Sequence, residues 1–327
     1  MNKAADNLLT GVTERFNTVP PDRRPDVLRS ITDPIAAANF AAQRHSADWS
    51  PCFDVVIPEL ASCALMLLIK DESDIISQNL EHHYHLGFRY FFVMDNSSTD
   101  GTADLIAVFR AKHSDALVIC VYDPVVAFYQ QEKMNALQIF AQNYLVHDKT
   151  DWIFFVDADE FITCCSARAE EAKAAFQAIL TDSKRKLMIF HWVQCASDLP
   201  IESINGGYEP QAVFSNRWRE LSPAVPKIAF RGNNGIMTTQ GNHTTSAYPF
   251  STDQAIVMSE VGFYILHYPM RSIRQLRQKI VNCGRSYEAY SGPNNFGDHW
   301  KTYYQWFQEH GESVLLRLLL EHIKSCK

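Results

Sequence analysis

The sequence predicts an α/β protein whose mostly parallel sheet is flanked by helices. Three observations favour this class: short apolar runs alternate with amphipathic stretches from residue 63 to residue 156, two of these runs end on an aspartate, and hydrophobic residues make up 46% of the 327-residue chain. An alternation of strand and helix patterns is typical of parallel strands joined by right-handed crossovers. The hydrophobic content is sufficient for a large core.

Strand and helix patterns follow one another in a regular order through the first half of the chain. Strands are indicated by short apolar runs, and helices by apolar residues spaced about three or four apart. Ile76, Leu80 and Tyr84 have the helical spacing, and Gly87 can end that helix. In chain order we expect strand 64–69, helix 73–86, strand 88–94, helix 102–112, strand 117–122, helix 130–146, strand 152–156, helix 167–180 and strand 187–193.

The remaining segments are less regular. Residues 1–58 are polar and rich in turn residues, so we expect an N-terminal extension. The stretch 194–254 is rich in Gly, Asn, Pro and Trp, a composition typical of an irregular segment that shapes a substrate site. The chain then continues with a strand at 262–266 and helices at 272–290 and 312–324.

Charge and composition exclude several classes of function. The formal charge of −7 and a pI near 5.9 argue against a nucleic-acid partner. The N-terminus lacks the apolar core of a signal peptide, and no apolar run reaches the roughly 18 residues of a membrane span, so we expect a cytoplasmic protein. The apolar helix at 312–324 is expected to pack on the core, with peripheral contact to the inner face of a membrane as the alternative. Eight cysteines without a Cys-x-x-Cys pair predict reduced, buried thiols.

The most informative motif is the turn after the strand at 152–156, where Asp157, Asp159 and Glu160 follow an apolar run. Two aspartates separated by one residue point the same way when they continue a strand, and divalent cations prefer carboxylate oxygens. The strand at 88–94 also ends on an aspartate, Asp95. Because ligands bind at the carboxyl ends of parallel strands, we expect the three aspartates to line one cleft that holds a cation. A solvated acidic turn is the alternative for a bare Asp-x-Asp pair.

Four motifs in this order resemble the GT-A glycosyltransferases, in particular the family 2-like branch, which also resembles the family 92 enzymes. The resemblance covers residues 61–162 and continues more weakly to Lys279. It implies a GT-A type, Rossmann-like sheet. The motifs are Lys70-Asp71-Glu72, His83-Tyr84-His85-Leu86-Gly87, the loop from Asp95 to Thr102, and Asp157-Ala158-Asp159-Glu160-Phe161.

The resemblance also implies a division of the chain. Residues 1–58 would be the N-terminal extension, 59–270 the GT-A domain and 271–327 a C-terminal helical segment. Within the domain, residues 59–162 would form the nucleotide-sugar half and 163–270 the acceptor half.

By position in the family, four residues after the first two strands would hold the nucleoside of the donor: Lys70, Glu72, Asp95 and Ser98. Asp159 would bind a Mn²⁺ or Mg²⁺ ion on the donor diphosphate, and Asp157 would contact the ribose or reach the metal through water. His267 would complete the metal site, with His243 as the competitor.

Cleavage of the bond between the anomeric carbon and the diphosphate leaves negative charge on the phosphate, which a cation stabilises. The basic candidates for this task are Lys133, Lys227, Arg271 and Lys279. Inversion also requires a carboxylate that takes the proton of the acceptor hydroxyl. Asp198 is favoured for its place in the irregular segment, and the other candidates are Glu160, Glu202 and Glu220. The chain departs from the family 92 pattern at Gln194-Cys195-Ala196-Ser197.

The leading hypothesis is therefore a metal-dependent, inverting transfer of a hexose from a nucleoside diphosphate sugar to a glycan or glycolipid acceptor, as in polysaccharide biosynthesis. Uridine is favoured over guanosine as the base. One alternative is a haloacid-type phosphohydrolase, because Asp100-Gly101-Thr102 and Asp157-Ala158-Asp159 each echo its nucleophile loop. The other is a non-catalytic protein of the same fold that binds a sugar nucleotide or a glycan.

Overall fold

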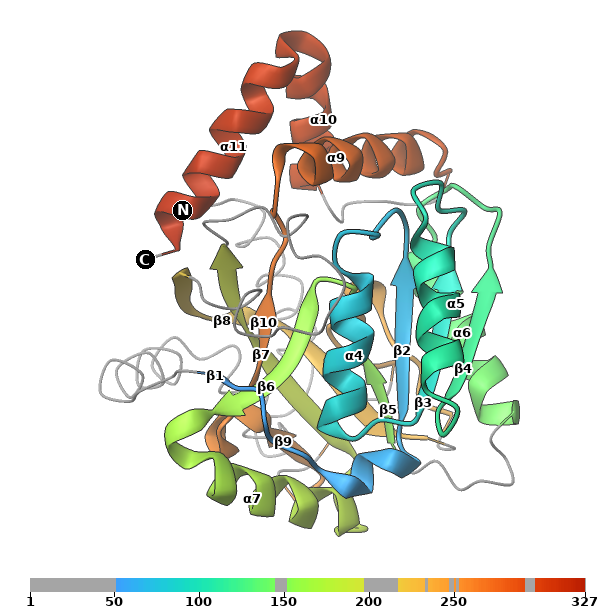
Figure 1. Ribbon diagram of the computed structural model, residues 1–327, viewed down its shortest axis with the longest axis vertical. Coiled ribbons are helices and arrows are strands. Elements are labelled where there is room, and N and C mark those ends of the chain that lie inside the picture. Colours follow the sequence, from blue (N-terminus) through green and yellow to red (C-terminus); the bar gives the residue numbers. More distant parts are fainter. Residues whose placement is uncertain are drawn as a thin grey trace.

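The computed structural model describes residues 51–144, 152–196, 217–232, 235–246, 250, 253–291 and 298–326. These residues form one ten-stranded sheet with helices on both faces (Figure 1). The strand order is β1-β6-β10-β7-β8-β5-β2-β3-β4, and β9 pairs with β7. The strands are β1 Pro51–Cys52, β2 Ala64–Ile69, β3 Tyr90–Asp95, β4 Leu117–Tyr122, β5 Trp152–Phe155, β6 Glu160–Cys165, β7 Leu187–Ala196, β8 Arg217–Arg231, β9 Ala255–Val257 and β10 Phe263–His267.

One half of the sheet is parallel. β5, β2, β3 and β4 lie side by side with all three pairings parallel. They are joined through α4 (Ile76–Leu86), α5 (Thr102–Lys112) and α6 (Gln130–Tyr144). The expected α/β class is thus confirmed, with element ends that differ from the expectation by a few residues.

In the parallel half, β5, β2 and β3 are buried on both faces because they are apolar at almost every position, whereas β4 at the edge exposes Cys120 and Tyr122. Leu65 and Leu67 of β2 belong to a core cluster that includes the apolar residues of α4, α5 and α7 (Ala169–Thr181). Met66 points to the opposite face and belongs to a second cluster with α6. The alternation of side chains along a strand explains why one run supplies two cores.

The other half of the sheet differs from the expectation. β6 begins at Glu160, directly after the acidic turn, and pairs antiparallel with β10. β8 occupies a stretch expected to be irregular, and it pairs antiparallel with both β7 and β5. β8 was missed because Pro223 and Pro226 interrupt its strand pattern, and β6 was missed because it follows the acidic turn without a break.

The chain joins the sheet before residue 58, which shifts the expected end of the N-terminal extension. Pro51 and Cys52 pair with β6, and Ile57 is fully buried in the core. Gly87, at the end of α4, has a φ of +135°, and a Cβ there would lie 2.2 Å from the carbonyl oxygen of Ile57. Only glycine allows this close approach. Residues 1–50 of the expected extension lie outside the described residues.

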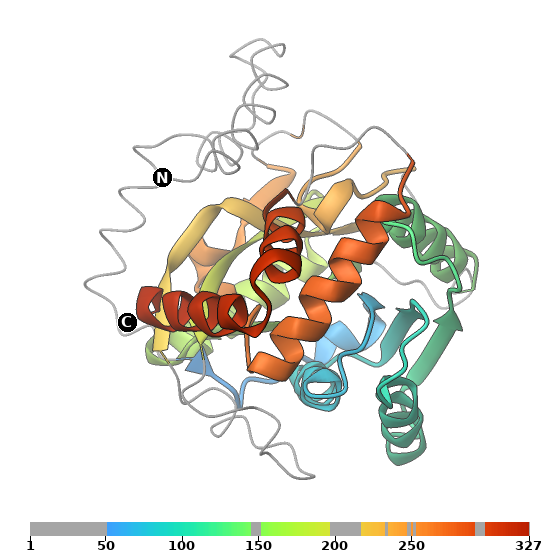
Figure 2. The ribbon, with the colours of Figure 1, turned by 90° about the horizontal axis from the view of Figure 1, so that it is seen from above.

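Three helices complete the described chain: α9 (Ile273–Glu288), α10 (Asp298–His310) and α11 (Glu312–Ser325). They share a cluster of their own, built around Leu276, Ile280 and Leu315. The sequence expectation missed α10, although Trp300, Tyr303, Tyr304 and Phe307 have helical spacing and pack against this cluster. Figure 2 shows α9 from above, lying across the molecule on the side where β2 ends.

α11 packs on the rest of the protein, as expected, but only one of its sides is buried. Val314, Leu315 and Leu318 of α11 are buried, whereas Leu316 and Leu320 are exposed. Peripheral membrane contact through these two residues stays a prediction. Within the described part of the chain, every helix is too short or too polar to cross a bilayer. All eight cysteines are free thiols, and Cys120 is exposed, so the expectation that all are buried is wrong.

Candidate functional site

The acidic turn between β5 and β6 is held by hydrogen bonds within its own backbone and from the side chains of Glu160 and Asn79. The N–H of Glu160 donates to the carbonyl oxygen of Asp157, and the N–H of Asp157 donates to Glu160 Oε2 at 2.9 Å. The side-chain amide Nδ2 of Asn79, on α4, donates to the backbone carbonyl oxygens of Asp157, Ala158 and Glu160. Because β5 is parallel to β2, this turn lies at the edge of the sheet where the parallel strands end.

Asp157 is neutralised by a lysine from the sheet. Lys227 of β8 is 1% exposed, and its Nζ lies 2.8 Å from Asp157 Oδ2 and 3.4 Å from Glu160 Oε1. Burial alone would lower the pKa of Lys227, but Asp157 and Glu160 raise it. Burial raises the pKa of Glu160 well above its usual value. The ion pair is therefore between Lys227 and Asp157, whose side chain remains 33% exposed.

Glu160 does not fit the catalytic base that the sequence expectation allowed. Its carboxyl group is fully buried beneath the turn and accepts a hydrogen bond from the backbone of Asp157. A group without access to the cleft cannot reach an acceptor hydroxyl. Glu160 instead holds the turn and the ammonium of Lys227 in place.

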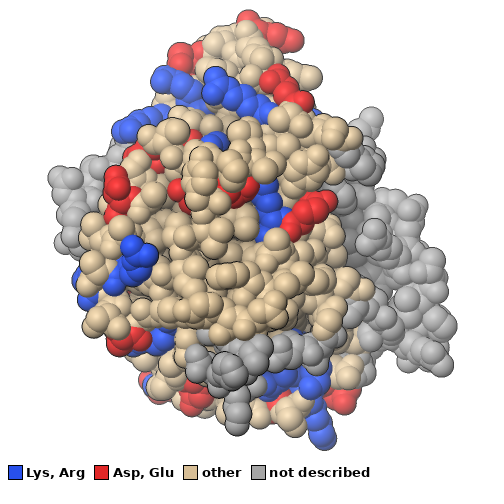
Figure 3. Space-filling model, turned by 90° about the vertical axis from the view of Figure 1, so that its right-hand side faces the viewer, with Lys and Arg blue, Asp and Glu red and all other residues tan. Residues whose placement is uncertain are grey.

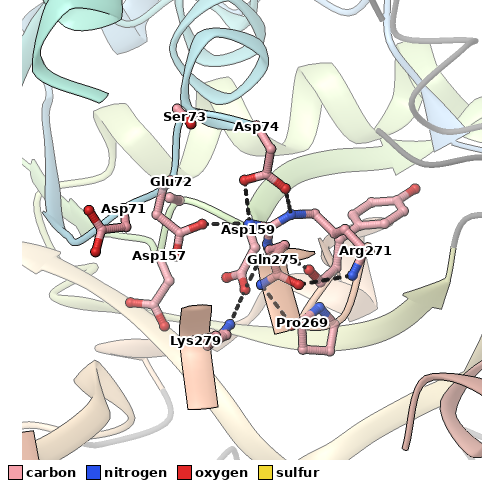
Figure 4. A network of polar contacts seen from close by, with 12 residues as sticks. Asp71, Glu72, Ser73, Asp74, Asp157, Asp159, Pro269, Arg271, Gln275 and Lys279 are labelled. Carbon is pink, nitrogen blue, oxygen red and sulfur yellow. Dashed lines mark hydrogen bonds and ion pairs between the residues drawn. The ribbon is translucent and has the colours of Figure 1, made fainter. Parts of the chain in front are cut away.

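Asp159 is neutralised by Lys279 and Arg271, which come after the last strand in sequence. Its Oδ2 lies 2.5 Å from Nζ of Lys279, on α9, and 3.5 Å from Arg271 (Figure 4). Burial would raise the pKa of the Asp159 carboxyl, but these charges, that of Lys279 first, hold it below its usual range. Because of these cations, Asp159 stays charged although its side chain is only 2% exposed.

His267, at the end of β10, faces the other oxygen of Asp159. Its Nε2 lies 3.7 Å from Asp159 Oδ1, and its Nδ1 lies 3.0 Å from Oε1 of Gln194. Since an amide oxygen only accepts, Nδ1 carries the hydrogen and Nε2 carries the lone pair in the neutral ring. Burial lowers the pKa of His267 to about 3, so the ring is neutral at pH 7. Trp192 stacks on it with centroids 4.4 Å apart.

This donor set fits a divalent cation chemically. A lone pair and a carboxylate oxygen face each other without a hydrogen between them, and a hydrogen-bonded amide fixes the histidine tautomer, as is usual around metal-bound histidine. However, the expected set of Asp157, Asp159 and His267 is not assembled. In the described part of the chain, no group of three His, Cys, Asp or Glu side chains is close enough to hold an ion. The metal roles of these residues remain predictions.

Arg271 ties α9 to the segment after β2. Its side chain is fully buried, and it pairs with Glu72 at 2.6 Å and with Asp74 at 2.7 Å. Burial raises the pKa of Glu72 to about 7 against the opposing charge of Arg271. Glu72 and Arg271, both expected to contact the donor, therefore bind each other in this structure.

The loop after β3 is held by the residues after β2. Asp95 is buried and accepts from the N–H of Ser98, whose hydroxyl accepts from the N–H of Asp71. Lys70 donates to the carbonyl oxygens of Asn96 and Ser97. Asp95 lies at the same edge of the sheet as the acidic turn, because β3, β2 and β5 are parallel neighbours. Its carboxylate points to its own loop.

Asp71 is a site residue that the sequence expectation missed. It has a φ of 53°, in the region that favours glycine, and accepts from the N–H of Thr99 at 2.6 Å. Its Oδ2 accepts from Gln278 and Asn282 of α9. Asp71 thus joins the loop after β3 to α9. The other missed residues are Asp74, Gln194, Gln275 and Asp123, and only their place beside expected residues could have indicated them.

Other expected site residues bind partners outside the acidic turn. Lys133 pairs with Asp123 at 2.8 Å, next to the end of β4. His243 binds the carbonyl oxygen of Pro226 at 2.7 Å, and burial lowers its pKa to about 3. Asp100 accepts from the N–H groups of Ser73 and Thr102, so it holds its loop and is not placed as a phosphohydrolase nucleophile. Asp198, Glu202 and the side chain of Glu220 lie outside the described residues.

Charged side chains are unevenly distributed over the surface of the described residues. On the face shown in Figure 3, acidic and basic side chains are interspersed near the margins, and the centre is mainly uncharged. Several Lys and Arg side chains lie near one another in the upper part of this face (Figure 3). Exposed apolar residues of the described chain include Tyr122 of β4 and Phe140 and Tyr144 of α6.

No family model and no curated protein sequence matches this chain. Among solved structures, the chain is similar to a mannosyltransferase, PcManGT from Pyrobaculum calidifontis, in complex with GDP-Man and Mn²⁺. The identity is 15% over 90% of this chain and 84% of that chain, with a TM-score of 0.36. A likeness this weak carries no argument about the function of this chain. The α/β class follows from the sheet itself.

Proposed function

We propose that this chain is a glycosyltransferase that binds a nucleoside diphosphate sugar, together with a divalent cation, at the turn from Asp157 to Asp159. One observation carries the proposal: the lone pair of neutral His267 faces Asp159 Oδ1 at 3.7 Å, at the edge where the parallel strands end. A carboxylate and an imidazole in this relation suit Mn²⁺ or Mg²⁺. The four GT-A-like sequence motifs support the same class.

The chain's own residues can perform most of the binding. Lys227 and Lys279 supply positive charge beside the two aspartates, where the diphosphate of a donor would lie. Lys70 and Ser98 hold the loop expected to contact the nucleoside, and Asp95 fixes the start of that loop. Such preorganised charges lower the barrier to departure of a phosphate leaving group. When bound at Asp159 and His267, a divalent cation would add further positive charge at the departing diphosphate.

The finer parts of the proposal rest on the sequence. The donor is proposed to be a UDP-hexose, the reaction to proceed with inversion, and the acceptor to be a glycan or glycolipid. Asp198 is proposed as the base that takes the proton of the acceptor hydroxyl. Lys133 holds Asp123 at the end of the neighbouring strand, where the base of the nucleotide would lie. Work in the cytoplasm on polysaccharide biosynthesis is part of the same proposal.

Thermal unfolding with UDP, GDP, UDP-glucose and GDP-mannose, each with and without Mn²⁺, tests the binding step. A ligand at 100 times its Kd stabilises the folded state by about 2.7 kcal/mol. We expect a rise in Tm with a UDP ligand and Mn²⁺ together that exceeds the sum of the separate effects. If Tm rises with none of these nucleotides, either with or without Mn²⁺, the proposal is overturned.

Donor hydrolysis separates an enzyme from a non-catalytic protein of the same fold. With Mn²⁺ and a UDP-hexose, slow release of UDP in water is expected from a transferase without its acceptor. Binding without release, with or without glycan acceptors, would instead favour the non-catalytic alternative.

A further inference from the structure

The ammonium of Lys279 binds one oxygen of Asp159, next to the oxygen that would bind a divalent cation together with His267. Its Nζ lies 2.5 Å from Asp159 Oδ2, and Arg271 lies 3.5 Å from the same oxygen. Both oxygens of this carboxylate therefore face partners, because Oδ1 faces His267. The side chain of Lys279 is 20% exposed, whereas that of Arg271 is fully buried. Of the two cations, Lys279 is therefore the one whose head group can move into solvent.

The residues on either side of Lys279 hold α9 in place, so the lysine side chain can move without moving the helix. Ser272 caps the start of α9 by accepting from the N–H of Gln275. Gln278 and Asn282 bind Asp71, and farther along the helix Ser286 accepts from the N–H of Phe128. These contacts span both sides of Lys279. The head group of Lys279 can thus exchange its partner while α9 stays in place.

Lys279 and Arg271 already lie against Asp159 Oδ2, and a divalent cation would add a third positive group to the same carboxylate, whose repulsion falls on the more mobile Lys279. A divalent cation that uses Asp159 and His267 would lie beside the present position of the ammonium. The displaced ammonium would then need a new anionic partner within reach. A diphosphate at the edge of the sheet would provide that partner, because lysine binds phosphate as a mobile point charge.

We propose that Lys279 is an internal counter-ion of Asp159, which a divalent cation displaces and which then binds the diphosphate of the donor. This inference rests on the proposed function and assigns Lys279 a positioning role in it. It makes the binding of the cation and of the nucleotide mutually dependent. The cation alone binds weakly because it must remove Lys279 from a buried carboxylate. The diphosphate lowers that cost by receiving the ammonium.

Titration of Mn²⁺, followed by the electron paramagnetic resonance of the free ion, tests this exchange without any turnover. The Lys279→Met variant is expected to bind Mn²⁺ alone at least about tenfold more tightly than the wild type. Its affinity for UDP in the presence of saturating Mn²⁺ is expected to fall by at least about tenfold. Lys279→Arg, which keeps the charge, is expected to bind Mn²⁺ alone as weakly as the wild type. The matched control is Arg277→Met, which removes an exposed pair with Glu312 from the same helix and should change neither affinity.

The outcomes separate the two proposals. Equal or weaker Mn²⁺ binding by Lys279→Met, in a variant whose circular dichroism is that of the wild type, overturns the exchange. Loss of UDP affinity without a gain in Mn²⁺ affinity also overturns it and makes Lys279 a simple phosphate ligand. If the wild type binds neither Mn²⁺ nor UDP or GDP, the proposed function itself fails.

Discussion

Asp157 and Asp159 lie in one turn, yet each is neutralised by a lysine from a different part of the molecule. Lys227 belongs to β8 in the centre of the sheet and is 1% exposed, whereas Lys279 belongs to α9 and is 20% exposed. The sheet lysine also contacts buried Glu160, so its departure would leave both acids without a cation. The difference indicates that the first pair maintains the turn and that the second pair is exchangeable. Four predictions test this comparison.

The largest expected effect is on turnover. Asp159→Asn removes the charge that is proposed to bind the cation, and we expect turnover of a UDP-hexose to fall by about 1,000-fold. Mn²⁺ affinity should fall with it. The matched Asp157→Asn variant is expected to keep more of its Mn²⁺ affinity and to lose stability, because it leaves Lys227 paired only with Glu160. Turnover of Asp159→Asn within tenfold of the wild type would break the comparison.

The second effect is on stability. Lys227→Met leaves partly exposed Asp157 and buried Glu160 without their cation, and we expect a loss of about 2 kcal/mol or more. Lys279→Met should cost less, about 1 kcal/mol, because Arg271 remains 3.5 Å from the buried carboxylate of Asp159 and keeps it paired. Urea unfolding followed by circular dichroism measures both. Equal losses would show that the two pairs serve the same purpose.

The third effect is a dependence on pH near the sheet lysine. Burial, aided by the charge of Lys227, lowers the pKa of His243 to about 3, against 6.5 for a free histidine. Between these values the unfolded chain binds a proton that the folded chain does not, so stability falls as the pH is lowered below 6.5. From pH 6.5 to pH 5 the loss amounts to about 2 kcal/mol. His243→Gln should remove this part of the slope, and identical slopes would contradict it.

The smallest effect concerns Asp71, which joins the loop after β3 to the helix that carries Lys279. Asp71→Ala and Asp71→Gly both lose the bonds to Thr99, Gln278 and Asn282. Only glycine accommodates a φ of 53° without strain, so the alanine variant should be less stable by about 1 kcal/mol. Thermal unfolding of the two variants isolates this backbone term. A glycine variant that is the less stable of the two would contradict the assignment.

The parallel half of the fold could be predicted because its signals are local. Each strand of that half is a short apolar run, three of the four are followed in sequence by a helix, and Asp95 and Asp157 stand at the ends of two of the runs. Parallel pairing then brings their strand ends to one edge without any further information. The strands β6 and β8 could not be recognised in this way, since no helix separates β6 from β5 and two prolines interrupt the pattern of β8.

The candidate site was predictable in its residue types and less so in its partners. Lys227, Arg271, Lys279 and His267 were all named from the sequence, and all four contact the acidic turn. The sequence did not indicate that Arg271 would be taken by Glu72 and Asp74. Such pairings depend on side-chain packing between segments about 200 residues apart, as the separation of 199 between Arg271 and Glu72 illustrates.

The position of β10 has a consequence for how the protein is made. This strand is the last of the sheet in sequence, yet it lies between β6 and β7, which are synthesised before it. Until residue 267 has left the ribosome, those two older strands expose backbone groups that can pair with another chain. We therefore expect nascent or truncated chains that end before β10 to aggregate or to occupy chaperones, even when their parallel half is already native.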